Sequence, residues 1–265
     1  MAATTTYALA LSPEERARYR MMASIAHADE RDAWSAAGIL PGATVADVGC
    51  GPGAVLRRLA EAVGPLGRAD GVDVADEAVA AAAAEVGDLP QAAVHRGEAG
   101  ATGLPTGAYD VVMCRHVLAH NGGHEQRIVA HLADLARPGG AVYLVDVDAP
   151  SAWIEPQDPD LADLTERYRR FQSGRGNDMA VGRRLGVLLA GAGLAVERYT
   201  CGGSVLRLPV GVRPPAWAAR EVMVAAGVAT VADVTRWEAA LLRADGAAVR
   251  PWGALPMCVA VGRAV

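Results

Sequence analysis

Three histidines recur at four-residue spacing in the middle of the chain: His116, His120 and His124. Histidine titrates near neutral pH, so its imidazole can take a proton from a hydroxyl or an amine. On one unbroken helix this spacing would also place three imidazoles on one face, where they could bind a metal ion. The Gly122-Gly123 pair interrupts such a helix, and no acid stands at a suitable spacing to support the rings. We therefore expect no metal site, and we favour His120, then His116, as a general base.

Two aspartates offer a second source of a base. Asp146 and Asp148 stand at the end of the apolar run 141–147. If this run is a strand of a parallel sheet, both acids lie at the mouth where such folds bind their ligands, and one of them could orient a substrate or accept its proton. The competing interpretation is plainer: these acids, like the histidines, are ordinary packed or solvated side chains.

A glycine-rich turn carries the strongest signal in the chain. Residues 45–53 read Val-Ala-Asp-Val-Gly-Cys-Gly-Pro-Gly, an apolar run that enters a turn, and a helical pattern follows. Glycine permits a sharp bend and a close approach to a ligand, and the next helix N-terminus offers unpaired N–H groups. Asp73 ends a second apolar run, 20 residues beyond Gly53. A glycine turn with a downstream acid is how a doubly wound fold holds an adenosine-containing cofactor.

Two classes of cofactor fit a turn of this kind. The spacing Gly49-x-Gly51-x-x-Ala54 fits the fingerprint of dinucleotide-binding enzymes, which would make the protein an NAD-dependent oxidoreductase. Asp47 inside the first apolar run and Pro52 between the last two glycines point elsewhere. With these two residues, the stretch resembles motif I of the class I S-adenosylmethionine-dependent methyltransferases.

The resemblance to this methyltransferase family extends through five motifs in the family's order, over roughly residues 40–147. The motifs after the glycine turn are Gly71–Val74, Gly97–Ala99 with Leu104-Pro105, Tyr109–Val112 and Leu135–Gly140. Glu98 stands where the family usually has Asp. The resemblance implies an α/β fold of the Rossmann-like kind. Its sheet would be doubly wound, mostly parallel and seven-stranded, with a C-terminal antiparallel strand and helical cap insertions.

The same resemblance implies the residues that hold S-adenosyl-L-methionine, and S-adenosyl-L-homocysteine as product. The glycine backbone would face the methionine and ribose parts, Asp47 would support the loop or the amino group, and Asp73 would accept from both ribose hydroxyls. Glu98 and Ala99 would lie beside the adenine, and Arg115 beside the methionine end. The whole implied set is Asp47, Gly49, Gly51, Gly53, Asp73, Val74, Glu98, Ala99 and Arg115.

Composition limits the partners of the protein. The net charge is −5, all 25 basic residues are arginine, and no extended basic groove shows, so we expect a small-molecule acceptor and no nucleic acid. Neither a secretion signal nor an apolar span of about 18 residues is evident, so we expect no membrane helix. The scattered cysteines favour a reduced, cytoplasmic protein; they are Cys50, Cys114, Cys201 and Cys258. The oligomeric state stays open, with a homodimer as one option.

Alternating strand and helix patterns would position these residues in a single domain over 1–265. The expected strands are 43–49, 69–74, 92–97, 109–115, 141–147, 194–201 and 255–263. The expected core helices are 54–63, 76–86, 124–136 and 178–191. An N-terminal helix that begins at Ser12 and stops near Gly38 would belong to a cap, residues 1–40. Two insertions, 148–177 and 205–250, would complete this cap, and the second would hold helices at 217–226 and 231–243.

The first insertion contains four arginines: Arg167, Arg169, Arg170 and Arg175. If they line the pocket they would suit a carboxylate or a phosphate of the substrate, and otherwise they form a solvated helix face. We predict a methyltransferase that acts on a small molecule of the natural-product type by in-line displacement, a reaction that depends mainly on alignment. The alternative is a protein of the same fold that binds the cofactor without methylating, such as a cyclase. The acceptor atom is not readable from the sequence.

Overall fold

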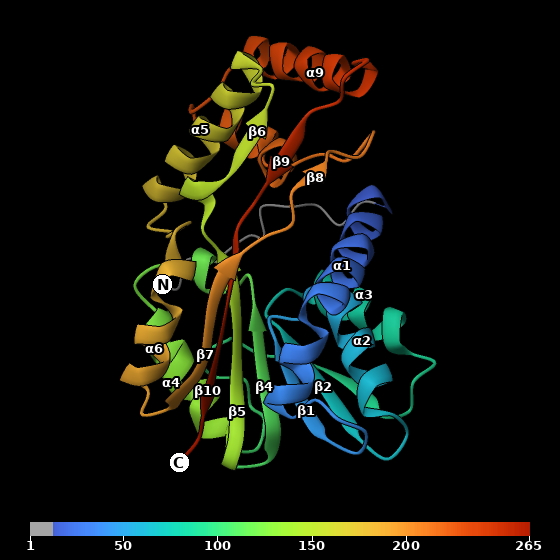
Figure 1. Cartoon of the computed structure of the whole chain (residues 1–265), viewed down its shortest axis with the longest axis vertical. Helices are drawn as coiled ribbons and strands as arrows, with labels where there is room; N and C mark the ends of the chain where they lie inside the picture. Colours follow the sequence, from blue (N-terminus) through green and yellow to red (C-terminus); the bar gives the residue numbers. More distant parts are fainter. Residues whose placement is uncertain (1–12) are drawn as a thin grey trace.

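The computed structural model describes residues 13–265, and within them a sheet of seven strands forms the centre of the molecule (Figure 1). The strand order is β3-β2-β1-β4-β5-β10-β7. Every pair from β3 to β5 is parallel, whereas β10 is antiparallel to both β5 and β7. The strands are β1 Thr44–Val48, β2 Arg68–Asp73, β3 Ala92–Arg96, β4 Tyr109–Arg115, β5 Ala136–Val147, β7 Ala195–Gly202 and β10 Met257–Arg263. This order confirms the predicted Rossmann-like sheet with its C-terminal antiparallel strand.

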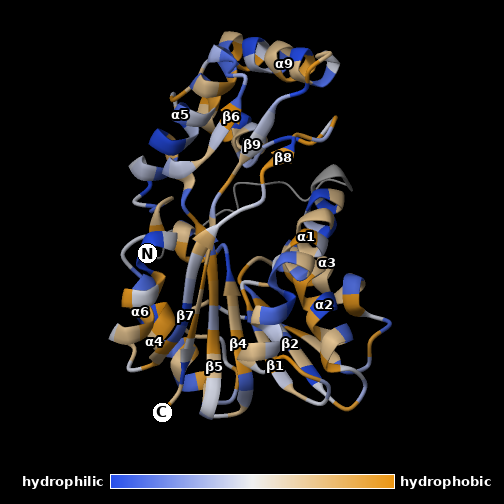
Figure 2. Ribbon diagram, in the orientation of Figure 1, coloured by the Kyte–Doolittle hydropathy of each residue, from blue (hydrophilic) through white to orange (hydrophobic). Residues whose placement is uncertain are grey.

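Helices pack on both faces of the sheet, and each face has its own apolar core. On one face Trp34, Leu56 and Leu59 pack against inward residues of β1, β4 and β5. On the other face Leu132 and Leu185 do the same. Figure 2 shows β4 and β5 hydrophobic over most of their length, as expected for strands covered on both sides. The flanking helices are α1 Pro13–Ala37, α2 Ala54–Val63, α3 Asp76–Val86, α4 Glu125–Leu135 and α6 Leu185–Gly191.

Local sequence accounts for the helices nearest the glycine turn. α2 buries Leu56, Leu59 and Val63 on one stripe and ends at Gly64, so its bounds agree with the predicted 54–63. α3 carries Asp76 and Glu77 in its first turn, where acids favour the positive end of the helix dipole, and it too has the predicted bounds. The predicted N-cap of α1, Ser12, lies outside the described residues.

A second lobe lies beyond the carboxyl ends of the parallel strands (Figure 1). It has a three-stranded antiparallel sheet in the order β6-β9-β8 and an apolar cluster of its own, which includes Leu164, Phe171 and Trp237. Its elements are β6 Trp153–Glu155, α5 Pro159–Gly174, β8 Leu206–Arg207, α7 Pro215–Ala218, α8 Arg220–Ala225, α9 Val231–Gly246 and β9 Trp252–Ala254. The three strands were not predicted, because runs of two or three residues show no periodicity and owe their form to distant partners.

Three expected elements differ from the structure by more than a shift of one to three residues at an end. The predicted helix 178–191 begins as a 3₁₀ turn, η3 (Val181–Arg184), before α6. The predicted helix 217–226 is divided into α7 and α8 at Ala219. β5 begins at Ala136 rather than at 141, because Ala136 pairs with Tyr109 of β4 across an irregular register. Within residues 13–265, no helix combines the length and the apolar character that a membrane span requires.

A disulfide between Cys201 and Cys258 corrects the expectation of four reduced cysteines. The two residues are 57 positions apart in the sequence, yet they are direct partners across the antiparallel pair β7–β10. Their pairing is a result of sheet order, which cysteine spacing does not reveal. Cys50 and Cys114 are free and buried. The cytoplasmic location stays a prediction.

Candidate functional site

The glycine turn after β1 has three left-handed residues, with φ of 80° at Gly49, 53° at Gly51 and 84° at Gly53. An added Cβ at Gly49 would overlap the side chain of Val117, and one at Gly53 would lie 2.8 Å from the Cα of Ala82. These two glycines are therefore required by packing within the protein. An added Cβ at Gly51 meets no atom within 4 Å. Gly51 is the position where the backbone faces open space, as contact with a ligand would require.

Asp73 joins the end of β2 to this turn. Its side chain is buried, and one carboxylate oxygen accepts the backbone N–H of Gly51 at 2.9 Å. The other oxygen accepts the N–H of Ala75 at 3.0 Å, and Ala75 is the N-cap of α3. An ionised carboxylate has about four lone-pair sites, so each oxygen of Asp73 can still accept one further hydrogen bond.

Asp47 is a buried acid with an unused acceptor. Its side chain is 2% exposed, and its Oδ2 has no hydrogen-bond partner among residues 13–265. Burial raises the pKa of Asp47 to about 7, the Arg115 charge opposes this shift, and the Asp73 charge adds to it. Buried polar atoms are almost always hydrogen-bonded, so an orphaned carboxylate oxygen beside an open glycine turn fits a donor supplied by a ligand.

The end of β3 lies beside the same acid. The N–H of Gly97 donates to the backbone oxygen of Asp73 at 3.0 Å, which brings Glu98 and Ala99 to the edge of the site. Glu98 is exposed, Ala99 is half-buried, and Val74 beyond β2 is 46% exposed. An exposed apolar side chain next to an exposed acid suits a flat ring system that carries hydrogen-bond donors at its edge. The structure therefore brings together the predicted residues of β1, β2 and β3.

Arg115 at the end of β4 is paired within the protein. Its guanidinium lies 2.7 Å from the carboxylate of Glu30 on α1, and both side chains are nearly buried. The hydroxyl of Tyr143 donates to the same carboxylate at 3.0 Å. Sequence reasoning missed Glu30, because an acid on a long polar helix is ordinary and its partner lies 85 residues away.

His116 and His120 follow β4, as expected. His116 is half-buried and has a left-handed backbone conformation, with φ of 55°. Its backbone N–H donates to the Val145 carbonyl at 2.9 Å. Burial, followed by neighbouring positive charges such as Arg115, lowers the pKa of His116 to about 3. His120 is the last residue of the 3₁₀ turn η1 (Leu118–His120). The partial removal of its ring from water, followed by the Arg175 charge, lowers the pKa of His120.

His124 does not share a helical face with the other two histidines. It is the exposed N-cap of α4, and Gly123 before it has φ of 81°. The left-handed conformation of His116 and the 3₁₀ turn that follows it also rule out a continuous α-helix from His116 to His120. In the part of the chain that the structure describes, no group of three His, Cys, Asp or Glu side chains is arranged to hold a metal ion.

Asp146 and Asp148 hold the backbone in place around the site. Asp146 is buried, and its two oxygens accept the N–H groups of Ala119 at 3.1 Å and Val147 at 2.9 Å. Burial raises its pKa to about 6 against these hydrogen bonds. At Asp148 burial is outweighed by hydrogen bonds from Arg183 and Ser151, so its pKa lies below the usual range. Asp146 thus positions η1, and through it His120.

The arginines of the first insertion differ in their partners. Arg169 and Arg170 both pair with Glu166 one turn away, as on a solvated helix face. Arg167 pairs with Asp163 and with Asp233 of α9, and thus joins α5 to α9.

Arg175 is different from these three. Among the described residues it has no carboxylate within ion-pair distance, and its guanidinium stacks on Phe171 at 5.4 Å. The segment after it packs on η1, since the N–H of Asp178 donates to the Ala119 carbonyl at 3.1 Å. An added Cβ at Gly122 would also overlap the Gly176 carbonyl. Arg175 is thus the member of the four that stands beside His120.

A doubly wound sheet with a glycine turn after β1 and a buried acid after β2 defines a class of Rossmann-like enzymes that bind adenosine cofactors. Residues 45–140 match the family model described as a methyltransferase domain, and they contain the glycine turn, Asp73 and Arg115. Residues 45–140 of this chain are thus similar to a methyltransferase domain.

The sequence of this chain is similar to those of known proteins over part of its length. It is 33% identical over 168 residues to an uncharacterised 37.1 kDa protein in transposon TN4556 of Streptomyces fradiae, which covers 63% of this chain and 48% of that protein. It is 39% identical over 117 residues to nocamycin O-methyltransferase of Saccharothrix syringae, which covers 43% of this chain and 41% of the relative. The chain thus spans about half the length of the curated relatives it matches.

A solved structure of similar fold is the YcgJ protein from Bacillus subtilis. The two structures superpose with a TM-score of 0.58 at 18% identity, over 89% of this chain and 98% of the other. At this identity the likeness shows the fold alone. It covers almost the whole of both chains, so the similarity includes the sheet on which the site is built.

Proposed function

We propose that this protein transfers a methyl group from S-adenosyl-L-methionine to a small-molecule acceptor by in-line displacement. The observation that carries the proposal is the orphaned Oδ2 of buried Asp47, beside the open backbone of Gly51. An ammonium group is the donor that a buried carboxylate pairs with best. When bound, the cofactor supplies an electrophilic methyl group on a sulfonium, and the protein aligns it and excludes water.

The other predicted cofactor residues fit complementary parts of the same molecule. Asp73 has spare acceptor capacity for two ribose hydroxyls. Val74 offers an apolar surface to the adenine, and Glu98 with Ala99 lies at its edge. Arg115 acts through Glu30 and through its charge on Asp47. In this proposal Gly49 and Gly53 shape the turn while Gly51 contacts the ligand.

His120 is the proposed proton acceptor for a hydroxyl or amine acceptor, with His116 as second choice. His120 is exposed at the mouth, whereas His116 has a pKa of about 3 and is therefore a weak base. Asp146 holds the turn that carries His120 through the N–H of Ala119. His120 thus reaches the acceptor from a fixed backbone.

Residues 1–40, 148–177 and 205–250 form the proposed cap over the acceptor within one methyltransferase domain, 1–265. The described parts of this cap are α1 and the second lobe. The second lobe lies at the carboxyl ends of the strands, where open α/β sheets bind ligands. An acceptor of the natural-product type is supported by the nocamycin O-methyltransferase relative. Arg175, beside His120 and without an acidic partner among the described residues, suits an anionic group on this acceptor.

Titration calorimetry tests the cofactor, with S-adenosyl-L-homocysteine and NAD as probes. We expect binding of the first and none of the second. Asp73→Asn should weaken S-adenosyl-L-homocysteine binding by roughly 10- to 100-fold, since hydrogen bonds to a charged group contribute about 1.5–3 kcal/mol. Asp76→Asn is the matched control, because Asp76 is an exposed acid paired with Arg96, and it should bind as the wild type does.

Each other outcome points to a different function. Binding of NAD instead of S-adenosyl-L-homocysteine would support an oxidoreductase. An unchanged affinity in Asp73→Asn would remove Asp73 from the site. Binding of S-adenosyl-L-homocysteine without methyl transfer to any of a panel of hydroxylated and amino compounds would favour the non-methylating alternative.

A further inference from the structure

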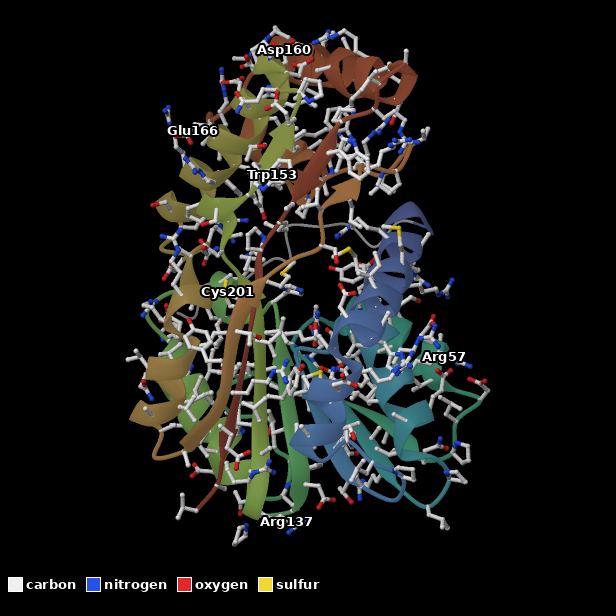
Figure 3. All side chains as sticks on the ribbon, in the orientation of Figure 1. Arg57, Arg137, Trp153, Asp160, Glu166 and Cys201 are labelled. Carbon is white, nitrogen blue, oxygen red and sulfur yellow. A yellow bond between two sulfur atoms is a disulfide. The ribbon has the colours of Figure 1, made fainter. Side chains whose placement is uncertain are left out.

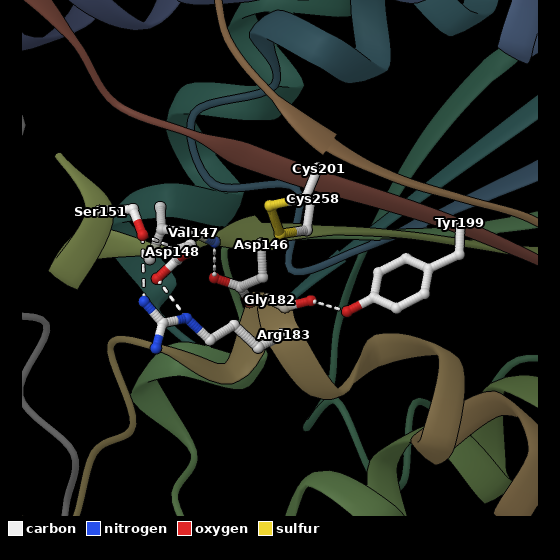
Figure 4. The surroundings of a disulfide bond; sticks show 9 residues. All are labelled: Asp146, Val147, Asp148, Ser151, Gly182, Arg183, Tyr199, Cys201 and Cys258. Carbon is white, nitrogen blue, oxygen red and sulfur yellow. Dashed lines mark hydrogen bonds and ion pairs between the residues drawn. A yellow bond between two sulfur atoms is a disulfide. The ribbon is translucent and has the colours of Figure 1, made fainter.

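The disulfide Cys201–Cys258 stands where the core sheet meets the second lobe (Figures 3 and 4). β7 ends at Gly202 and leads into β8, while β9 leads back into β10 at Met257. The covalent bond therefore joins the outgoing and the returning chain at the base of the second lobe. The loop that it closes contains all of β8, α7, α8, α9 and β9.

The bond is accessible from one side. It lines an open hollow of about 350 Å³, together with Asp148, Arg183, Tyr199 and Thr200. Cys201 is exposed, whereas Cys258 is fully buried. We therefore expect an attacking thiolate to approach Cys201 rather than Cys258. In the same hollow, the Arg183 guanidinium is paired with Asp148 at 2.8 Å.

The disulfide is also joined to the site by a short series of contacts. Cys258 is the register partner of Asp146 on β5, and Asp146 holds the N–H of Ala119, the residue before His120. The hydroxyl of Tyr199 donates to the Gly182 carbonyl at 2.6 Å, which fixes η3 to β7 on the same side. A change in the β7–β10 pairing therefore reaches both the second lobe and η1.

We propose that Cys201–Cys258 is a thiol–disulfide exchange site for a dithiol reductant, and that the bond sets how firmly the second lobe is held over the acceptor site. The proposal rests on the proposed function only for the consequence at the acceptor. The exchange and its effect on the lobe need no cofactor or acceptor. A disulfide in a reducing compartment is commonly a redox-sensing one, which agrees with the exposure of Cys201.

The exchange consumes one dithiol for each disulfide. A thiolate of the reductant attacks Sγ of Cys201, the Cys201–Cys258 bond breaks, and Cys258 leaves as a thiolate that takes a proton. The second thiolate of the reductant then attacks the mixed disulfide, and Cys201 leaves and is protonated in turn. The reductant becomes a disulfide, so two electrons and two protons pass to the protein.

Reduction should loosen the second lobe and leave the core sheet intact. Without the bond, β7 and β10 are joined by their backbone hydrogen bonds and by the ion pair between Arg263 and Glu197, and β7 is an exposed edge strand. A crosslink that closes a long loop restricts many open conformations, so its loss increases local opening. The glycine turn and Asp73 are in a different part of the core and should be unaffected.

Hydrogen exchange measured by mass spectrometry, with oxidised and with dithiothreitol-treated full-length protein, tests this proposal without any ligand. We expect exchange in residues 205–250 to rise on the order of tenfold after reduction, and exchange in residues 44–63 to stay constant. Native alkylation should then label Cys201, which is exposed, whereas Cys258, Cys50 and Cys114 are buried. Reduction should change the affinity for S-adenosyl-L-homocysteine by less than about twofold. If neither the oxidised nor the reduced form binds this ligand, the result counts against the proposed function and not against the exchange.

Two variants separate the bond from other thiol effects. Cys201→Ala/Cys258→Ala should exchange like the reduced wild type and be insensitive to dithiothreitol. Cys114→Ala, which alters a buried free cysteine, should keep the full response. If the double variant does not fold, the treated wild type still gives the comparison. Three results would overturn the proposal: no disulfide in protein oxidised with glutathione disulfide, a disulfide that dithiothreitol cannot reduce in the native state, or equal exchange in both forms.

Discussion

The Arg115 guanidinium lies 2.7 Å from the Glu30 carboxylate, and the two side chains keep only 9% and 11% of their surface exposed. This pair attaches α1 to the end of β4, and the Arg115 charge acts on both Asp47 and His116. Tyr143 donates to the same carboxylate, so one residue of α1 connects two central strands. The helix α1 is thereby tied to the carboxyl end of β4 in addition to packing on the sheet.

Removal of Glu30 should be costly. Glu30→Ala leaves the Arg115 charge nearly buried without its partner, which typically destabilises a protein by about 3 kcal/mol or more. Chemical denaturation followed by circular dichroism measures this change. Glu61→Ala is the matched control, because Glu61 pairs with Arg58 on the surface, and such pairs contribute less than about 1 kcal/mol. Equal effects of the two substitutions would show that the buried pair has no special role.

Two glycines of the same turn should respond differently to alanine. Gly53→Ala forces a left-handed alanine against Ala82 of α3 and should destabilise the fold by about 3 kcal/mol. Gly51→Ala meets open space, so it should cost only about 1 kcal/mol of backbone strain. It should nevertheless weaken S-adenosyl-L-homocysteine binding by about tenfold or more, because the added Cβ stands where we expect the ligand.

Thermal unfolding and calorimetry of the two variants check this contrast. The critical result is the affinity of Gly51→Ala. A folded variant that binds as tightly as the wild type would show that the ligand does not approach this part of the turn.

The affinity for S-adenosyl-L-homocysteine should depend on pH through Asp47. The raised pKa of about 7 means that Asp47 is mostly protonated below pH 7 in the free protein. An ammonium group pairs with the ionised form, so affinity should fall by about tenfold for each pH unit below 7 and level off above it. Calorimetry between pH 5.5 and 8.5 measures the profile.

Asp47→Asn supplies the comparison for this profile. It should bind more weakly than the wild type at pH 8 and should lose the dependence near pH 7, since an amide does not titrate there. A wild-type affinity that is constant from pH 5.5 to 8.5 would mean that Asp47 is ionised throughout or does not contact the ligand.

His120→Ala should lower the rate constant of methyl transfer by roughly 10²–10⁴, the range for a lost general base. Cofactor affinity should hardly change, because the side chain would contact the acceptor. The pKa of His120 is lowered by burial and by the Arg175 charge, so the wild-type rate should rise with pH through the titration of this imidazole and level off once the base form predominates. The variant should lose this dependence.

Single-turnover formation of S-adenosyl-L-homocysteine at saturating acceptor measures the rate of both forms. His124→Ala is the control: His124 is exposed, makes no capping hydrogen bond to α4, and should leave the rate unchanged. A near-wild-type rate in His120→Ala would mean that alignment alone drives the reaction and that the acceptor arrives already activated.

The sequence by itself determined the sheet and most of the helices of its core, and it predicted a set of cofactor residues, which stay a prediction. Residues 45–53 and Asp73 are readable because a strand, a tight turn and a helix start each have local chemical requirements. α2 and α3 have their predicted bounds for the same reason: apolar spacing, first-turn acids and a terminal glycine act within one or two turns. Parallel order then follows from the alternation of strands and helices.

Only the tertiary structure decided which of the candidate side chains already have hydrogen-bond or ion-pair partners within the protein. Arg115 is paired with Glu30 and Asp146 with the Ala119 backbone, while one oxygen of Asp47 has no described partner. The Cys201–Cys258 bond, the short strands of the second lobe and the separation of His124 from His120 are likewise absent from any local pattern. Each depends on contacts between residues far apart in the chain, and such contacts are formed only when the sheet order and the packing of the lobes bring those residues together.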